Sequence, residues 1–298
     1  MTAPFLGDAL GPRGRRTTRI VSVLSALVIA GFVAVAISRL GDRGQLDESR
    51  WEPFTDPSVQ RFLLEGLRAT VEVAVVSMIG AIVIGALMAL ARLSRTPPVR
   101  WLATTYVEFF RGVPLILLIF FSAFGLPSYG VDLSVFWYLA LGLIIYNGAV
   151  LGEIFRAGIL SLDRGQSEAA YSLGLTYWQS MLLVVIPQAA RRMIPAIVSQ
   201  LVTLLKDTSL GAAIGYFELL RRARVTGEFY VNPLQALFVA AVMYIIVNFA
   251  LSRLARWLEV RQRRRFGAGS ISVTGVEDLA VVGAQAQAAM GGAGGTAT

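Results

Sequence analysis

Few side chains in this 298-residue sequence could do chemistry. There is no histidine and no cysteine, which removes imidazole bases, thiol nucleophiles, disulfides and nearly every transition-metal site. The single lysine, Lys206, is followed by Asp207, Thr208 and Ser209, and this polar group interrupts an apolar run. These groups could bind a small polar molecule, but they do not form a set of nucleophile, base and orienting group. The sequence therefore predicts binding or transport, with no catalytic residue and no metal site.

The composition is that of a membrane protein. Hydrophobic residues make up 55% of the chain and charged residues 15%, and the mean hydropathy is +0.64. Such values lie outside the range of ordinary globular proteins. The net charge of +8 rests on 27 basic residues, which lie between apolar runs and form no single stripe with interleaved aromatic residues. That distribution excludes a nucleic-acid surface.

Six apolar runs are long enough to cross a hydrocarbon layer roughly 30 Å thick, which takes about 20 residues of helix. They are 20–38, 73–91, 105–126, 134–152, 194–215 and 229–252. The first run has a basic flank like that of a signal peptide, but it is long and no clear cleavage site follows, so we expect a retained helix. The predicted fold class is an all-α integral membrane protein with six transmembrane helices.

Arginine in the connecting segments predicts the orientation, because cytoplasmic loops are enriched in basic residues. With the N-terminus inside, the cytoplasmic segments hold 17 basic residues and the outer segments hold eight. Both termini are therefore expected in the cytoplasm. We expect a basic N-terminus over 1–19, an exposed extracytoplasmic linker over 39–61 and a disordered Gly- and Ala-rich tail over 262–298.

The longest cytoplasmic connection, about 155–190, lies between the fourth and fifth spans and exceeds what two neighbouring helices need. Ser167 is expected to cap a helix that starts at Glu168, whose carboxylate would lie at the positive end of the helix dipole. Gly174 can end this helix or allow a tight turn. The connection thus has the pattern of a structured loop.

The same connection offers a face for a partner. Ala169 and Ala170 provide small side chains against which another backbone can pack closely. Pro187 suits the first turn of a following helix, and Pro195 is expected to break the chain just before the fifth span. A short helix, a turn and a second helix would fit a groove on another protein.

The loop is similar to the "EAA" loop of binding-protein-dependent ABC importer permeases, written E-A-A-x3-G-x9-I-x-L-P. Glu168-Ala169-Ala170 is followed by three residues, Gly174, nine residues and Val184-Val185-Ile186-Pro187. It departs in having Val184 for Ile and Ile186 for Leu, both apolar exchanges. The stretches 106–114, 152–158, 200–210 and 219–224 resemble the polar amino-acid branch of that family, and the glutamate-type permeases within it.

The resemblance covers about 62–261 and implies a permease core of five helices, to which the N-terminal helix is an addition. It implies that the loop helix docks on a separate cytoplasmic ATPase dimer, where ATP and Mg²⁺ would bind. This chain has no G-x4-G-K-[ST] phosphate loop and is expected to bind no cofactor. A second permease subunit, identical or paralogous, and an extracytoplasmic binding protein would complete an importer in the bacterial cytoplasmic membrane. It would move a polar amino acid, with glutamate the best candidate, by alternating access.

Two interpretations of the intramembrane charges remain open. Charges inside a membrane are costly, so each normally has a partner or a function. In the first interpretation, a substrate cavity is lined by Lys206, Asp207, Thr208 and Ser209. In the second, Lys206 and Asp207 pair with other charged residues of the spans and hold the bundle together, the candidates being Glu108, Arg111 and Glu153.

Further charges lie at three-residue spacing near span ends. Glu108 and Arg111 share one helical face and can pair with each other, and both are candidate pathway residues. Glu153 and Arg156 have the same spacing, which favours a local ion pair. Pro114 is expected to kink the third span, as a gate requires, although transmembrane helices tolerate proline without such a role.

Two other classes of protein compete with this interpretation. An ion-coupled secondary amino-acid transporter would favour internal repeats with paired broken helices, and the sequence shows no convincing repeat. A membrane scaffold or sensor would not require a charged pair inside a span. Neither class explains the loop around Glu168.

Overall fold

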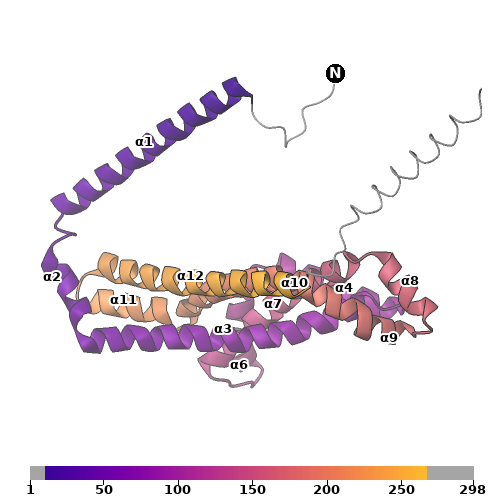
Figure 1. Ribbon diagram of the computed structural model, residues 1–298. Helices are drawn as coiled ribbons and strands as arrows, with labels where there is room; N and C mark the ends of the chain where they lie inside the picture. Colours follow the sequence, from indigo (N-terminus) through magenta and orange to yellow (C-terminus); the bar gives the residue numbers. More distant parts are fainter. Residues whose placement is uncertain (1–10, 267–298) are drawn as a thin grey trace, which may run out of the picture.

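The computed structural model describes residues 11–266, and within that range every regular element is helical. Helix α1 (Pro12–Asp42) contains the first apolar run, which confirms the prediction of a helix there. It runs away from the other helices (Figure 1), and none of its candidate span is buried. The expected tail begins inside helix α12, which extends to Phe266, and the rest of the tail lies outside the described residues.

Four long helices form the bundle: α3 (Pro57–Arg92), α7 (Val135–Leu160), α10 (Ile186–Asp207) and α12 (Pro233–Phe266). They lie side by side in Figure 1, and their shared core includes Ala81, Leu151 and Met193. Glycines bring α3 and α7 together, because a Cβ at Gly85 would lie 2.8 Å from the Cβ of Leu151. Small residues allow this close approach where lipid supplies no hydrophobic drive between helices.

The third expected span is not one helix. Helix α4 (Pro97–Gly112) meets α5 (Leu115–Phe120) at a bend of 102°, and α5 continues through a π-turn, η2 (Phe121–Gly125), into α6 (Leu126–Ser128). Pro114 lacks a backbone N–H, and the residue before it, Val113, is extended. The expected kink is therefore a break, and the prediction of a continuous helix over 105–126 is wrong.

The fifth expected span starts earlier than predicted. Short helix α9 (Tyr177–Ser180), π-turn η3 (Met181–Val185), α10 and the 3₁₀ segment η4 (Thr208–Ile214) form one helical run. Pro187 lies in the first turn of α10 as expected, but Pro195 lies inside α10 and does not break it. Neighbouring groups can satisfy the backbone that a proline frees, so its presence does not end a helix here.

The linker over 39–61 is largely exposed, as expected, and it is ordered. It forms α2 (Glu48–Trp51) and the 3₁₀ turn η1 (Glu52–Thr55), and it packs on the start of α12. The Asn232 amide donates to the carbonyl of Arg50 at 2.9 Å, and the Gln235 amide donates to the carbonyl of Gln45 at 2.6 Å. These buried amides fix the linker, because an unpaired buried amide is costly.

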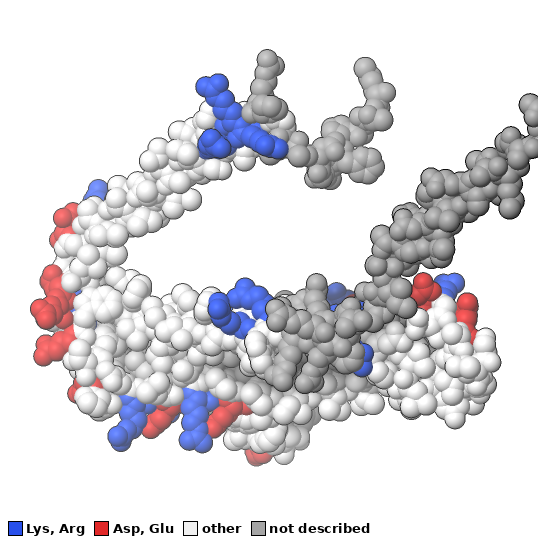
Figure 2. Space-filling model, viewed as in Figure 1, with Lys and Arg blue, Asp and Glu red and all other residues white. Residues whose placement is uncertain are grey.

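The outer surface of this linker is acidic. Figure 2 shows acidic side chains gathered where α1, α2 and α3 connect, and those of the sequence there are Asp42, Asp47, Glu48, Glu52 and Asp56. Asp56 caps α3, and hydrogen bonds from the side chain and backbone of Ser58, both 2.7 Å, hold the pKa of its carboxyl below the usual value.

The sixth expected span begins later than predicted, since Phe229 ends α11 (Leu219–Phe229) and α12 begins at Pro233.

Candidate functional site

The loop helix α8 (Arg164–Ser172) begins four residues before the expected start. Asp163 is its cap, and its carboxylate accepts a hydrogen bond from the backbone of Gly165 at 2.8 Å. Ser167 instead donates to the carbonyl of Arg164 within the helix, so the prediction of a Ser167 cap is wrong. Asp is at least as good a cap as Ser, and the earlier Asp takes the position.

The turn after α8 confirms the role expected of Gly174. Its φ is +81°, which favours glycine, and the N–H of Leu175 donates to the carbonyl of Ala170 at 3.2 Å. This is a Schellman arrangement that satisfies the last carbonyls of the helix. Thr176 and Gln179 then form a reciprocal capping box at the start of α9. The two short helices are thereby held at a defined turn.

The exposed side of α8 and α9 combines polar side chains with a few large apolar ones. Glu168 and Ala169 are exposed, but Ala170 is buried within the chain, so only half of the expected small-residue face is open. Leu173 is 84% exposed and Trp178 is 58% exposed. Large apolar side chains at this exposure on a loop are typical of a surface that another protein covers. The face defined by these residues is called the coupling face below.

Polar contacts attach α8 to α10. The side chain of Gln188 donates to that of Gln166 at 3.0 Å, and the Arg192 guanidinium donates to the carbonyl of Ser161 at 2.9 Å. Gln188 and Arg192 lie one turn apart on α10. These contacts connect α8, and the turn before it, to the helix that carries Lys206.

A second contact attaches α9 to the turn between α3 and α4. The Arg95 guanidinium lies 5.0 Å from the centre of the Tyr177 ring, at the distance of a cation–π interaction. Both residues line a cleft of about 200 Å³ with Trp178. The loop is thus connected to the first and the penultimate helix of the bundle.

Glu153 is the centre of an ionic cluster at the ends of α3, α4 and α7. It is hydrogen-bonded to Arg92 and lies 3.7 Å from Arg111 and 3.3 Å from Arg156, while Glu108 lies 3.7 Å from Arg92. The Glu153–Arg156 pair is confirmed, whereas Glu108 and Arg111 bind separate partners instead of each other. The cluster holds the end of α4, next to the break at Pro114, against α3 and α7.

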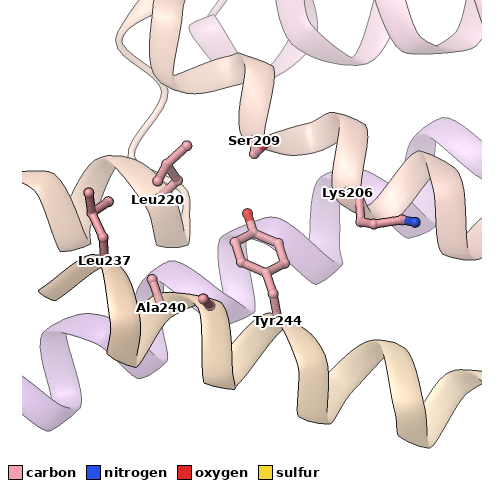
Figure 3. Close-up of a pocket in the computed structure, with 7 residues that line it drawn as sticks. Lys206, Ser209, Leu220, Leu237, Ala240 and Tyr244 are labelled. Carbon is pink, nitrogen blue, oxygen red and sulfur yellow. The ribbon is translucent and has the colours of Figure 1, made fainter. Parts of the chain in front are cut away.

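Lys206 and Asp207 take no part in this cluster. Within the described chain neither forms an ion pair, so the pairing with Glu108, Arg111 or Glu153 that the sequence left open is not realised. Lys206 and Ser209 instead line a cleft of about 260 Å³ between α10, η4, α11 and α12 (Figure 3). Asp207 is half-buried and does not line the cleft.

The other residues of the predicted cavity have different places. Thr208 is fully buried, and its hydroxyl donates to the carbonyl of Leu205 at 2.7 Å. Tyr244 of α12 contributes its hydroxyl to the cleft, and sequence analysis did not find it because nothing distinguishes it within an apolar run. Buried Asn147 accepts from the amide of Gln200 at 2.7 Å, and a lone Asn in an apolar span was a signal that could have revealed it.

The outward face of α10 carries four polar residues, with the small side chains of Pro195 and Ala196 exposed between them. Arg192, Ser199, Thr203 and Lys206 are exposed at spacings of seven, four and three residues, which places them on one face. Helix α10 is described along its whole length, and no large apolar side chain is exposed on it. Helices α3 and α12, by contrast, expose many. We call these four residues the polar stripe. A stripe of this kind is costly against lipid.

Comparison with known proteins finds relatives of this chain. Residues 81–264 match the family of the binding-protein-dependent transport system inner membrane component. The chain is 39% identical over 229 residues to the glutamate transport system permease protein GluD of Corynebacterium glutamicum, covering 76% of this chain and 84% of GluD. It is 42% identical over 206 residues to the probable glutamine ABC transporter permease protein GlnP of Bacillus subtilis, covering 67% and 94%.

A solved structure of an amino acid ABC transporter with histidines has a TM-score of 0.65 and 29% identity, over 68% of this chain and 94% of that chain. The chain therefore belongs to the family of inner membrane components of binding-protein-dependent transport systems. Within that family it is an amino-acid ABC transporter permease, which confirms the family resemblance and the all-α fold class.

Proposed function

We propose that this chain is the membrane subunit of a bacterial importer that brings a polar amino acid, glutamate as the best candidate, into the cytoplasm. Alternating access would be driven by ATP hydrolysis on a separate cytoplasmic subunit. The observation that carries the proposal is the polar stripe of α10. An exposed stripe on a membrane helix needs an aqueous pathway or another protein subunit beside it.

The stripe supports a pathway shared with a second permease subunit, identical or paralogous. Its outward residues are small or polar, so two copies of α10 facing each other would leave a hydrophilic route between them. Lys206 and Ser209 line the cleft at one end of this route, with Asp207 and Thr208 beside them. Glu108 and Arg111 would act at the inner end, where their cluster holds the broken span.

The coupling face supports the partner ATPase. Glu168 and Ala169 are open to a partner, Ala170 and Gly174 shape the turn, and Pro187 lies in the first turn of the helix that carries the stripe. ATP and Mg²⁺ would bind on that partner, and this chain would bind no cofactor. An extracytoplasmic binding protein would deliver the substrate at the opposite end. The charge distribution supports both termini in the cytoplasm.

Charge supports an anionic cargo. The stripe carries Arg192 and Lys206 and no carboxylate, and the one acid of α10 is half-buried Asp207. A cationic amino acid would meet like charges along such a route, whereas glutamate would meet opposite ones. The relatives GluD and GlnP are named for glutamate and glutamine, so uptake of these two amino acids is the comparison to make.

Uptake by the reconstituted complex tests the cargo. The complex with its binding protein is purified from native membranes, placed in liposomes loaded with ATP, and offered radiolabelled L-glutamate, L-glutamine or L-arginine. We expect ATP-dependent uptake of glutamate that exceeds uptake of arginine at least about tenfold. Preference for arginine would contradict the anionic cargo, and uptake driven by an ion gradient without ATP would contradict the mechanism.

A further inference from the structure

Tyr244 and Glu218 form a polar pair that the proposed transport route has not used. The Tyr244 hydroxyl points toward Ser209 across the cleft, whose other walls are apolar residues of α11 and α12, while the Lys206 ammonium lies away from Tyr244 (Figure 3). The same hydroxyl donates to the Glu218 carboxylate at 2.7 Å. Tyr244 therefore joins a buried acid to an open cleft.

The Tyr244 hydroxyl uses its one hydrogen in the bond to Glu218, so its oxygen can act only as an acceptor toward the cleft. The hydroxyls of Thr70 and Thr208 lie beside it as further hydrogen-bond partners, each also within donating distance of a backbone carbonyl, that of Gly66 at 3.0 Å and that of Leu205 at 2.7 Å. A phenolic oxygen that donates once can still accept. The cleft thus presents a tyrosine oxygen that can accept a further hydrogen bond.

Glu218 is fully buried and has every donor that a carboxylate needs. One oxygen accepts from the N–H of Leu220 at 2.8 Å as well as from Tyr244, and the other accepts from the N–H of Arg221 at 2.7 Å. Burial raises the pKa of the Glu218 carboxyl, whereas its three donors and the N-terminus of α11 favour the charged form. Within the described chain Glu218 forms no ion pair, and Arg224 acts on it only at longer range.

We propose that Tyr244, positioned by the buried Glu218 carboxylate, binds the α-ammonium group of the transported molecule in this cleft. An ammonium group offers a charged donor to the tyrosine oxygen and the positive charge that the buried carboxylate attracts. Ser209 and Lys206, whose side chain has four rotatable bonds, are left for the carboxylate end. The cleft therefore takes a free α-amino acid and rejects one whose nitrogen is acylated. This inference rests on the proposed transport function and assigns one end of its substrate.

Equilibrium binding tests the subsite without the binding protein, whose own selectivity would mask it. The permease–ATPase complex in lipid nanodiscs is titrated with L-glutamate, L-glutamine and L-arginine, each beside its Nα-acetyl derivative. We expect the wild-type complex to prefer the free form of its ligand by roughly ten- to a hundredfold, the range of a charge-assisted hydrogen bond. Tyr244→Phe is expected to bring this ratio close to one, and Glu218→Gln, which keeps an acceptor and loses the charge, to reduce it.

Tyr216→Phe is the matched control, because its hydroxyl donates to the carbonyl of Ala69 at 3.2 Å and does not line the cleft. It should leave the ratio unchanged, which separates recognition from a general loss of packing. Equal ratios in wild type and Tyr244→Phe, or no binding to the wild type at millimolar concentration, would overturn the inference while ATP-driven uptake persists. Absence of ATP-driven uptake in the wild type would instead overturn the proposed function.

Discussion

Replacing Gly174 with valine is expected to lower ATP-driven uptake roughly five- to thirtyfold while the chain still inserts into the membrane. The φ of Gly174 is +81°, and a left-handed conformation costs a residue with a Cβ about 1 to 2 kcal/mol. Space is not the cause, because a Cβ there would meet no atom within 4 Å. The strain would shift the turn between α8 and α9 and so misplace the coupling face. Initial uptake rates in ATP-loaded proteoliposomes measure the effect.

Two controls isolate the turn. Gly174→Asn should retain most uptake, since Asn tolerates this conformation. Gly130→Val places the same strain, at φ +77°, in the turn after α6 and should leave coupling intact. Glu168→Lys reverses an exposed charge on the coupling face without strain and should also uncouple transport from the ATPase. Wild-type uptake by both Gly174→Val and Glu168→Lys would contradict the role proposed for this face.

Replacing Lys206 with alanine is expected to raise the half-saturating substrate concentration roughly ten- to a hundredfold, or to abolish uptake. The reason is the loss of a charge-assisted hydrogen bond to the substrate carboxylate. Because Lys206 forms no ion pair within the described chain, its removal breaks none. Asp207→Ala is expected to raise the half-saturating concentration less, since Asp207 does not line the cleft.

Arg68→Ala is a matched control for the charge removed, because Arg68 pairs with Glu72 at 2.6 Å on an exposed face of α3. It should leave uptake unchanged, and Lys206→Arg should restore much of it because the charge returns. A fully assembled Lys206→Ala complex with the native half-saturating concentration would show that Lys206 does not contact the substrate.

Sequence patterns predicted the loop that carries the coupling face better than they predicted the bounds of the membrane spans. The turn at Gly174 needs a positive φ that only a few residues adopt. The presence of a glycine at this position therefore predicts the conformation of the turn. The cap was misplaced because both Asp163 and Ser167 are good caps and local sequence does not rank them. Pro114 signalled a kink, but the 102° bend also reflects how Arg111 and Glu108 bind α7 and α3. Such distant pairs leave no trace at local spacing.

The binding cleft was predicted only in part. Lys206 and Ser209 were visible because polar residues are rare in an apolar run. Tyr244 was not, since a tyrosine in a membrane helix usually packs or anchors the helix, and only the fold brings it to α10 and Glu218. The outward direction of the polar stripe likewise depends on which face of α10 packs against α7, and the sequence does not contain that packing in readable form.

Co-purification from native membranes in mild detergent, with mass spectrometry of the attached chains, tests the central claim most directly. We predict recovery of a cytoplasmic ATPase subunit together with a permease dimer, either two copies of this chain or this chain with a paralogue. Recovery of a folded chain alone, with no ATPase and no second permease, would contradict the importer and leave transport by an ion gradient as the function to test.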